Sequence, residues 1–173
     1  VILILFSCQK PQSKQMETLL VELNQNWFFS EAGSNQWYPA AVPGCVHTDL
    51  LSNKLIEDPF YRLNEQDLQW IDKKNWEYKN IFTVPENLLE SEHIELDFEG
   101  LDTYADVFLN NEPILHADNM FRSWKLQVKD RLKPGENELR ILFHSPTLLG
   151  EKELEKFGYQ LPASYDKSEH GEM

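Results

Sequence analysis

The stretch His93-Ile94-Glu95-Leu96-Asp97-Phe98-Glu99-Gly100 decides the fold class of this chain. Apolar and polar residues alternate through it, which places Ile94, Leu96 and Phe98 on one face of an extended strand. Gly100 follows the last alternating residue and is a typical strand terminator. The stretch therefore predicts a β-strand with one face turned to a core.

The same alternation recurs on both sides of this stretch. Residues 110–113, Asn-Asn-Glu-Pro, link two of the alternating segments, and Asn tolerates the positive φ that a tight hairpin turn needs. Short strands at this spacing, without βαβ alternation, are typical of a β-sandwich or jelly roll. The predicted fold class is all-β. The further segments predicted as strands are residues 76–84, 105–109, 114–116, 124–128 and 138–143.

The chain before residue 76 is less regular. The apolar run at residues 19–23 and the aromatic run at residues 27–29 are predicted to form the first strands. Residues 46–51 and 64–70 are predicted to form one or two helical turns each, with Asn64 as the N-cap of the second.

The pattern changes again beyond Pro146. Leu148, Leu149 and Phe157 recur at a spacing that predicts a short amphipathic helix, ended by Gly158. The sequence thus divides into a clipped, lipoprotein-like signal segment and tether at residues 1–15, a sandwich domain at residues 16–146, and a helix with a truncated loop at residues 147–173.

The charge of the chain excludes one class of partner. It carries 29 Asp and Glu residues against 16 Lys and Arg residues, a formal net charge of −13. Such a field repels a phosphate backbone, so the sequence predicts no nucleic-acid partner. Neutral sugars are not repelled, and Trp and Tyr side chains suit both sandwich cores and contacts with sugars.

The first eight residues, Val-Ile-Leu-Ile-Leu-Phe-Ser-Cys, are apolar and end in a small residue followed by Cys8. This pattern is typical of the end of a bacterial lipoprotein signal, so we expect a lipid anchor at Cys8 and a periplasmic or cell-envelope location, with an extracellular one as the alternative. The run is too short to cross a bilayer, which needs about 20 apolar residues. Cys45 is predicted to be a half-buried thiol.

No standard catalytic or cofactor motif is present. The chain has no Gly-rich phosphate loop, no HExxH and no paired CxxC, so we expect neither a metal nor a cofactor. Glu65 and Glu99 are interpreted as surface acids rather than as a glycosidase pair. The histidines are interpreted as structural or surface residues because no two have metal-ligand spacing: His47, His93, His116, His144 and His170.

Two longer stretches carry a family resemblance. Residues 37–51 read WYPAAVPGCVHTDLL, and residues 56–65 follow with IEDPFYRLNE. Residues 98–110 read FEGLDTYADVFLN and lead into DNMFR at residues 118–122. Together they resemble the N-terminal sugar-binding domain of β-mannosidases of the glycoside hydrolase family 2 type, within the clan of β-galactosidases and β-glucuronidases.

The resemblance implies a galactose-binding-like jelly roll packed on a (β/α)₈ barrel. In a retaining exo-β-mannosidase of this type the barrel supplies both catalytic Glu residues and releases terminal β-linked mannose from glycans. A barrel alone takes about 250 residues, so no catalytic residue is expected within this chain. The family's Trp-Asp-Trp-Gly-Pro segment, whose Asp holds the substrate, is expected beyond Met173.

The resemblance also singles out two loops near the substrate. Residues 59–65 are expected to face the barrel, and an amide or carboxylate suits sugar hydroxyls, which makes Asn64 and then Glu65 the first candidates. The second candidate loop is polar and aromatic and contains Asp118, Asn119, Phe121 and Arg122.

Three functional hypotheses remain open at this point. The first is a non-catalytic domain of a β-mannosidase, or the same domain of a related β-galactosidase or β-glucuronidase. The second is a free-standing carbohydrate-binding module, because fold alone does not separate the two. The third is a purely structural sandwich without a ligand.

Overall fold

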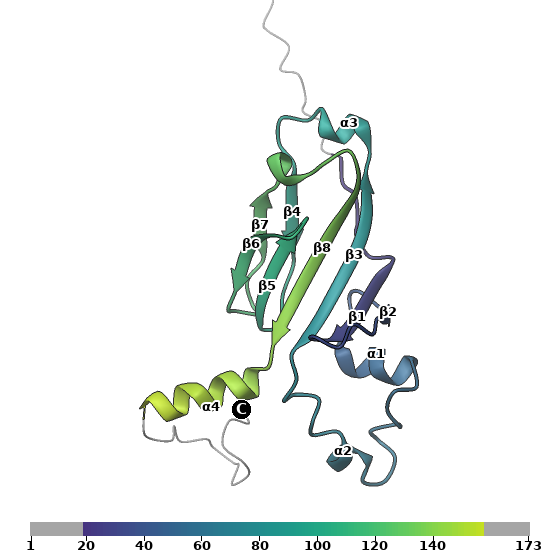
Figure 1. Cartoon of the computed structure of the whole chain (residues 1–173), viewed down its shortest axis with the longest axis vertical. Helices are drawn as coiled ribbons and strands as arrows, with labels where there is room; N and C mark the ends of the chain where they lie inside the picture. The colour runs from purple at the N-terminus through teal and green to yellow at the C-terminus, as the bar shows by residue number, and fades with distance from the viewer. Residues whose placement is uncertain (1–18, 158–173) are drawn as a thin grey trace, which may run out of the picture.

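The computed structural model describes residues 19–157, in which strands form two antiparallel sheets (Figure 1). The larger sheet has the order β2-β1-β3-β8-β5-β6, and the smaller one pairs β4 with β7. The predicted all-β sandwich is confirmed. The strands are β1 Trp27–Glu31, β2 Tyr38–Ala40, β3 Trp76–Val84, β4 Glu95–Phe98, β5 Tyr104–Leu109, β6 Glu112–Ala117, β7 Trp124–Gln127 and β8 Gly135–His144.

Short helices lie in several connections between strands, and one further helix follows the last strand, β8. The longest, α4, leaves the body of the sandwich at the end that also carries α1 and α2 (Figure 1). The helices are α1 Val46–Ser52, α2 Asn64–Asp67, α3 Glu86–Leu89, α4 Pro146–Phe157 and the 3₁₀ turn Lys129–Arg131. Within the described residues, no helix is long and apolar enough to cross a membrane.

The long antiparallel pair β3–β8 forms the centre of the larger sheet. Its register runs from Trp76 opposite Phe143 to Val84 opposite Gly135. Buried and less buried residues alternate along both strands, as the sequence pattern predicts. One face of this sheet therefore belongs to the core, and the other faces solvent.

Two different structures cover the core face of the larger sheet. The β4–β7 sheet covers one half, where Ile94, Leu109 and Val128 form a buried cluster. Over the other half, Leu50 of α1 and Ile71, from the irregular segment between α2 and β3, pack into the larger of the two buried clusters. The irregular segment before β3 is thus part of the second layer of the sandwich.

The β5–β6 hairpin has the tight turn that the sequence predicts. Asn110 and Asn111 have φ values of 53° and 67°, which Asn tolerates better than most residues. The strand resumes at once, so Glu112 and Pro113 belong to β6 rather than to the connection. The register shifts between Val107 and Phe108, a β-bulge that the sequence pattern does not reveal.

The prediction of a strand at residues 19–23 is wrong. Leu20 is 79% exposed, and β1 begins only at Trp27. Both edges of β1 are paired, with β2 and with β3, so the apolar run does not extend the ladder of the strand that follows it. The short strand β2 is missed because Pro39, which cannot donate to a ladder, interrupts its pattern.

The predicted helices form, but α2 spans only Asn64–Asp67 of the predicted residues 64–70. Helix α2 has Leu63 rather than Asn64 as its N-cap, so Asn64 is its first helical residue. Helix α4 confirms the predicted helix, but Leu148 and Phe157 of its expected apolar face are exposed, and its expected end at Gly158 lies outside the described residues. Cys45 is exposed, not half-buried, because it is the N-cap of α1 at the surface.

Candidate functional site

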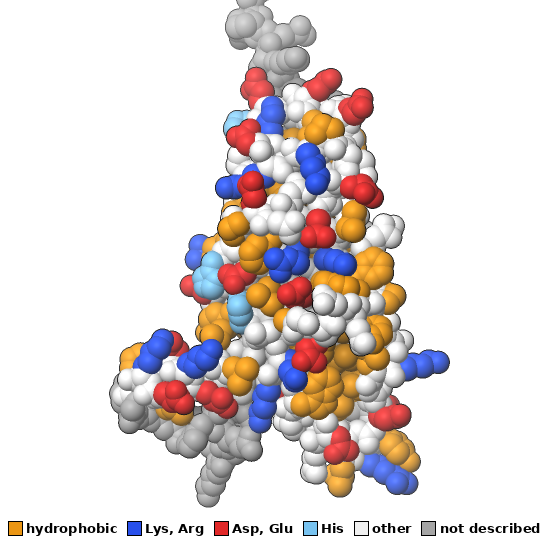
Figure 2. All heavy atoms as spheres, in the orientation of Figure 1, with side chains coloured by type: hydrophobic (Ala, Val, Ile, Leu, Met, Phe, Trp, Pro, Cys, Tyr) orange, Lys and Arg blue, Asp and Glu red, His pale blue; other side chains and the backbone are white. Residues whose placement is uncertain are grey.

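The first candidate loop joins α1 to β3 and presents large apolar side chains to solvent. Phe60, Tyr61 and Leu63 are 95%, 57% and 65% exposed. In the view of Figure 2, hydrophobic side chains gather in the lower part of the molecule, at the end that carries α1 and α2. Exposed apolar residues that gather in one region mark interaction sites more often than scattered ones do.

Asn64 and Glu65 lie in this loop at the start of α2. The Asn64 side chain is half-buried, and its Nδ2 donates to the Asp58 carbonyl at 2.8 Å. Glu65 is exposed, and its backbone carbonyl accepts from Gln69 Nε2 at 2.9 Å. The Asn64 amide therefore shapes its own loop, and within residues 19–157 no hydrogen bond engages its Oδ1.

The second candidate loop follows β6. Asp118 and Asn119 are exposed, and Asn119 Oδ1 accepts from the Phe121 backbone N–H at 2.8 Å. The Phe121 side chain is 86% exposed. Arg122 stacks on the ring of Trp124, with its guanidinium carbon 4.1 Å from the ring centroid. This loop thus offers one free aromatic ring beside an ordered polar turn.

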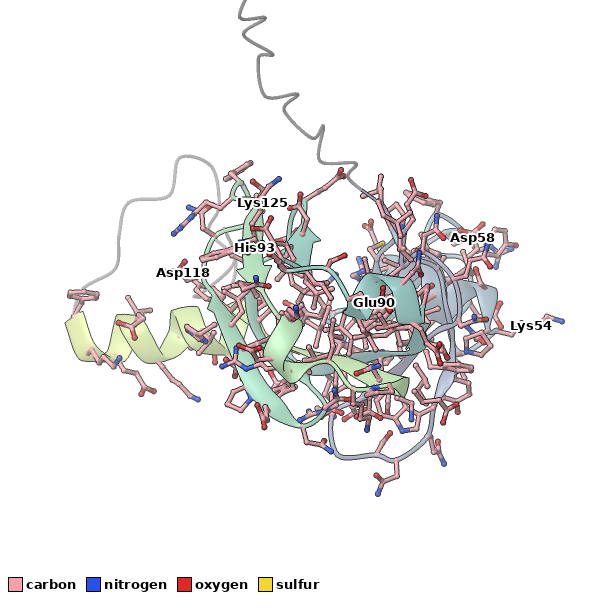
Figure 3. The ribbon with its side chains drawn as sticks, turned by 90° about the horizontal axis from the view of Figure 1, so that it is seen from above. Lys54, Asp58, Glu90, His93, Asp118 and Lys125 are labelled. Carbon is pink, nitrogen blue, oxygen red and sulfur yellow. The ribbon has the colours of Figure 1, made fainter. Side chains whose placement is uncertain are left out.

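The two candidate loops do not form one cluster. Figure 3 looks down on the molecule from above and shows Asp58 and Asp118 on opposite sides of the sandwich. Glu65 and Glu99 are both exposed, whereas a glycosidase general acid requires a partly apolar environment. Within residues 19–157, no three His, Cys, Asp or Glu side chains are placed to hold a metal ion.

The segment at residues 37–51 has a structural centre, Asp49, that the sequence analysis missed. Asp49 is only 2% exposed. Its Oδ1 accepts from the Ala41 backbone N–H at 2.9 Å, and its Oδ2 accepts from the Tyr78 hydroxyl at 2.8 Å. Burial and the neighbouring Asp49 raise the pKa of Tyr78, which keeps the phenol protonated as a donor. Asp49 thereby links α1 by hydrogen bonds to Ala41, in the segment before the helix, and to Tyr78 on β3.

A second unpredicted cluster lies on the solvent face of the larger sheet. Asp106 on β5 accepts from the ring nitrogens of His116 on β6 and His144 on β8, both at 2.7 Å. Partial burial raises the pKa of Asp106, but the hydrogen bonds and charges of the two histidines outweigh it and lower the pKa overall. Two of the histidines interpreted as structural or surface residues, His116 and His144, are therefore joined through one carboxylate.

Replacing Asp106 with Asn is expected to lower stability near neutral pH and to have little effect in strong acid. Because the folded-state pKa of Asp106 is depressed, its contribution is present above the unfolded value of about 3.9 and is lost as the pH falls through the folded value. Urea denaturation of both proteins between pH 2 and pH 7 measures the difference. A difference that grows towards low pH contradicts this assignment.

Comparisons with known proteins identify the family. A model of the glycosyl hydrolase 2 galactose-binding domain-like family matches residues 27–172. The chain belongs to this family. The β-mannosidase of Capra hircus is 36% identical over 140 residues, covering 81% of this chain and 16% of the relative. The β-mannosidase B of Thermothelomyces thermophilus is 38% identical over 141 residues, covering 80% of this chain and 16% of the relative.

Solved structures agree with this membership of the glycosyl hydrolase 2 family. The β-D-mannosidase of Dictyoglomus thermophilum superposes with a TM-score of 0.80 and 40% identity, covering 83% of this chain and 18% of that chain. The exo-chitosanase of Amycolatopsis orientalis, at 20% identity and a TM-score of 0.62 over 70% of this chain and 16% of that chain, shares the fold. The resemblance to β-mannosidases read from the sequence is confirmed, and this chain spans about a sixth of the length of the curated relatives given above.

Proposed function

We propose that this chain is the N-terminal, non-catalytic domain of a retaining exo-β-mannosidase that releases terminal β-linked mannose from glycans. In that role it braces a (β/α)₈ catalytic domain and shapes one wall of the substrate pocket. The choice of β-mannosidase within the family is supported by 40% identity to a solved β-D-mannosidase, against 17% to a solved β-D-glucuronidase.

The observation that carries the bracing role is the exposed apolar loop between α1 and β3. Phe60, the most exposed of its side chains, would lose nearly all of its water contact on docking. At about 25 cal/mol per Å² of buried apolar area, a cluster of this kind stabilises an interface between domains. We propose that Phe60, Tyr61 and Leu63 pack on the catalytic domain.

The candidate site residues acquire their proposed role from this docking. Asn64 and Glu65 adjoin the apolar residues in sequence, so docking of the loop would bring an amide oxygen and a carboxylate to the edge of the barrel. We assign Asn64 and Glu65 to contact with sugar hydroxyls. Asp118, Asn119, Phe121 and Arg122 remain a second proposed contact loop, on another side of the sandwich.

The alternative of a free-standing carbohydrate-binding module would require exposed aromatic rings on which a sugar chain can stack. The solvent face of the larger sheet supports this alternative less well than the proposed one. Lys79 Nζ lies 3.8 Å from the ring centroid of Trp37, and the Arg140 guanidinium carbon lies 4.2 Å from that of Phe108. Figure 2 shows charged side chains of both signs among the hydrophobic ones on this face. Cations over these two rings leave them no open platform for a sugar chain.

Three further assignments belong to the same proposal. We propose that residues 16–146 form the sandwich domain and that residues 1–15 comprise a lipoprotein-like signal segment and the tether before it. We also propose that Cys8 carries a lipid that holds the protein in the bacterial cell envelope. The apolar run that ends at Ser7 and Cys8 supports the anchor and the periplasmic location, and both residues lie outside the described part of the chain.

The proposal predicts that the 173-residue chain alone does not hydrolyse a β-mannoside. The expected rate of p-nitrophenol release from p-nitrophenyl β-D-mannopyranoside equals that of buffer, because the two catalytic carboxylates belong to the barrel. Intact mass must first confirm 20.4 kDa, which excludes a longer active species. Hydrolysis by material of that mass contradicts the assignment of this domain as non-catalytic.

A further inference from the structure

A hollow of about 200 Å³ opens at the edge of the sandwich, between the β1–β2 connection, the end of α1 and Trp70. Its floor is made of aromatic side chains from the core. Its rim carries polar groups from the β1–β2 connection. The residues that define it best are Glu31, Ser34, Gln36, Tyr38, Trp70 and Trp76. Its volume lies below the range of about 300–1,000 Å³ for sites of drug-sized ligands, so it suits one small ring rather than an extended chain.

The aromatic wall of the hollow is held in place before any ligand arrives. Trp70 is 38% exposed, and its ring centroid lies 6.1 Å from that of Trp76, which is 7% exposed. Trp76 Nε1 donates to the Ile71 carbonyl at 3.0 Å, which fixes the indole beneath Trp70. A side chain that is already ordered loses little entropy when a ligand stacks on it.

The polar rim offers both an acceptor and a donor. Glu31 Oε1 accepts from Lys74 Nζ at 2.7 Å, and Gln36 Oε1 accepts from the Tyr38 hydroxyl at 3.3 Å. Within residues 19–157, no hydrogen bond engages Glu31 Oε2 or Gln36 Nε2. A carboxylate oxygen and an amide N–H are therefore available beside an aromatic face.

We propose that this hollow binds one neutral hexopyranose ring. The apolar C–H face of the ring stacks on Trp70, while hydroxyl groups donate to Glu31 Oε2 and accept from Gln36 Nε2. Lys74 already pairs with Glu31, so the site needs no cation from the ligand, and the net charge of −13 disfavours an anionic sugar. This assignment does not depend on the proposed catalytic partner of the domain.

The test is a titration of the protein with methyl β-D-mannopyranoside, followed by the side-chain resonances of the Trp indoles and Gln amides in ¹H–¹⁵N spectra. Saturable shifts are expected at the Trp70 indole and the Gln36 amide. Trp70→Ala and Gln36→Ala should each weaken the binding about tenfold. Phe28→Ala is the matched control, because it removes a ring that is 39% exposed, about as accessible as that of Trp70, from β1 outside the hollow and should leave the affinity unchanged.

Two results overturn the proposal. One is the absence of a saturable shift at Trp70 in wild-type protein whose spectrum is that of a folded chain. The other is equal binding of sorbitol, a polyol without a ring face to stack. If Trp70→Ala alters the fold, the exposed Gln36→Ala variant decides, and unchanged affinity in that variant counts against the site. Hydrolysis assays of the chain test the proposed function separately, so the two failures are distinguishable.

Discussion

Asp49→Ala is expected to lower the free energy of unfolding by about 2–4 kcal/mol, one of the two largest effects of a single substitution that we predict for this domain. The substitution leaves the buried Tyr78 hydroxyl and the Ala41 backbone N–H without their acceptor. A buried donor that loses its partner costs about 1–3 kcal/mol, more than the net value of the bond itself. Urea denaturation followed by tryptophan fluorescence measures the loss.

Asp49→Asn is the matched control, because it keeps the shape of the side chain and one acceptor oxygen. We expect about half the loss seen for Asp49→Ala. Asp49 and Tyr78 should also be coupled, so the effects of Asp49→Ala and Tyr78→Phe should not add. A change below about 0.5 kcal/mol in Asp49→Ala contradicts the view that this carboxylate holds α1 on the sheet.

Gly44→Ala is the second large effect, expected to destabilise the domain by about 2–3 kcal/mol. A Cβ at this position would lie 2.3 Å from the Ala41 carbonyl oxygen, a contact that backbone atoms must move to relieve. The motion would act on the entry to α1, whose N-cap is the next residue, Cys45. Thermal and urea denaturation both report the loss.

Gly33→Ala is the comparison that distinguishes the steric clash at Gly44 from the cost of a left-handed backbone conformation. Gly33 has a φ of +83°, and a Cβ there would meet nothing within 4 Å, so its substitution costs only the left-handed conformation, about 1–2 kcal/mol. The steric account requires Gly44→Ala to be the more damaging of the two. A larger loss in Gly33→Ala would show that the close approach at Ala41 relaxes freely.

The strands were predictable where a local pattern alone determines them. Ile94, Leu96 and Phe98 alternate with charged residues, and Asn110 with Asn111 supplies the backbone freedom that the hairpin needs. The apolar run at residues 19–23 is equally hydrophobic yet forms no strand, because a strand also needs a partner strand beside it. Which segments pair depends on residues far apart in the chain, and no local pattern carries this information.

The sequence located the candidate loops along the chain, but it did not predict how the residues of these loops are arranged in space. The resemblance to β-mannosidases located Asn64 and Phe121, but it did not show that their loops lie apart. The bulge after Val107 places His116 opposite Asp106, and a regular two-residue hairpin would have placed Leu115 there. The hollow beside Trp70 likewise depends on contacts across the sandwich, between the β1–β2 connection and the segment before β3.

The most direct test of the central claim is a domain exchange. Residues 27–172 of this chain replace the matching domain of the Dictyoglomus thermophilum β-D-mannosidase, whose structure it matches with a TM-score of 0.80. The rate of p-nitrophenyl β-D-mannopyranoside hydrolysis by the hybrid is the measurement. A hybrid that hydrolyses the mannoside is the predicted result. A hybrid that is folded and monodisperse but inactive on the mannoside would contradict the proposal that this domain braces a β-mannosidase barrel.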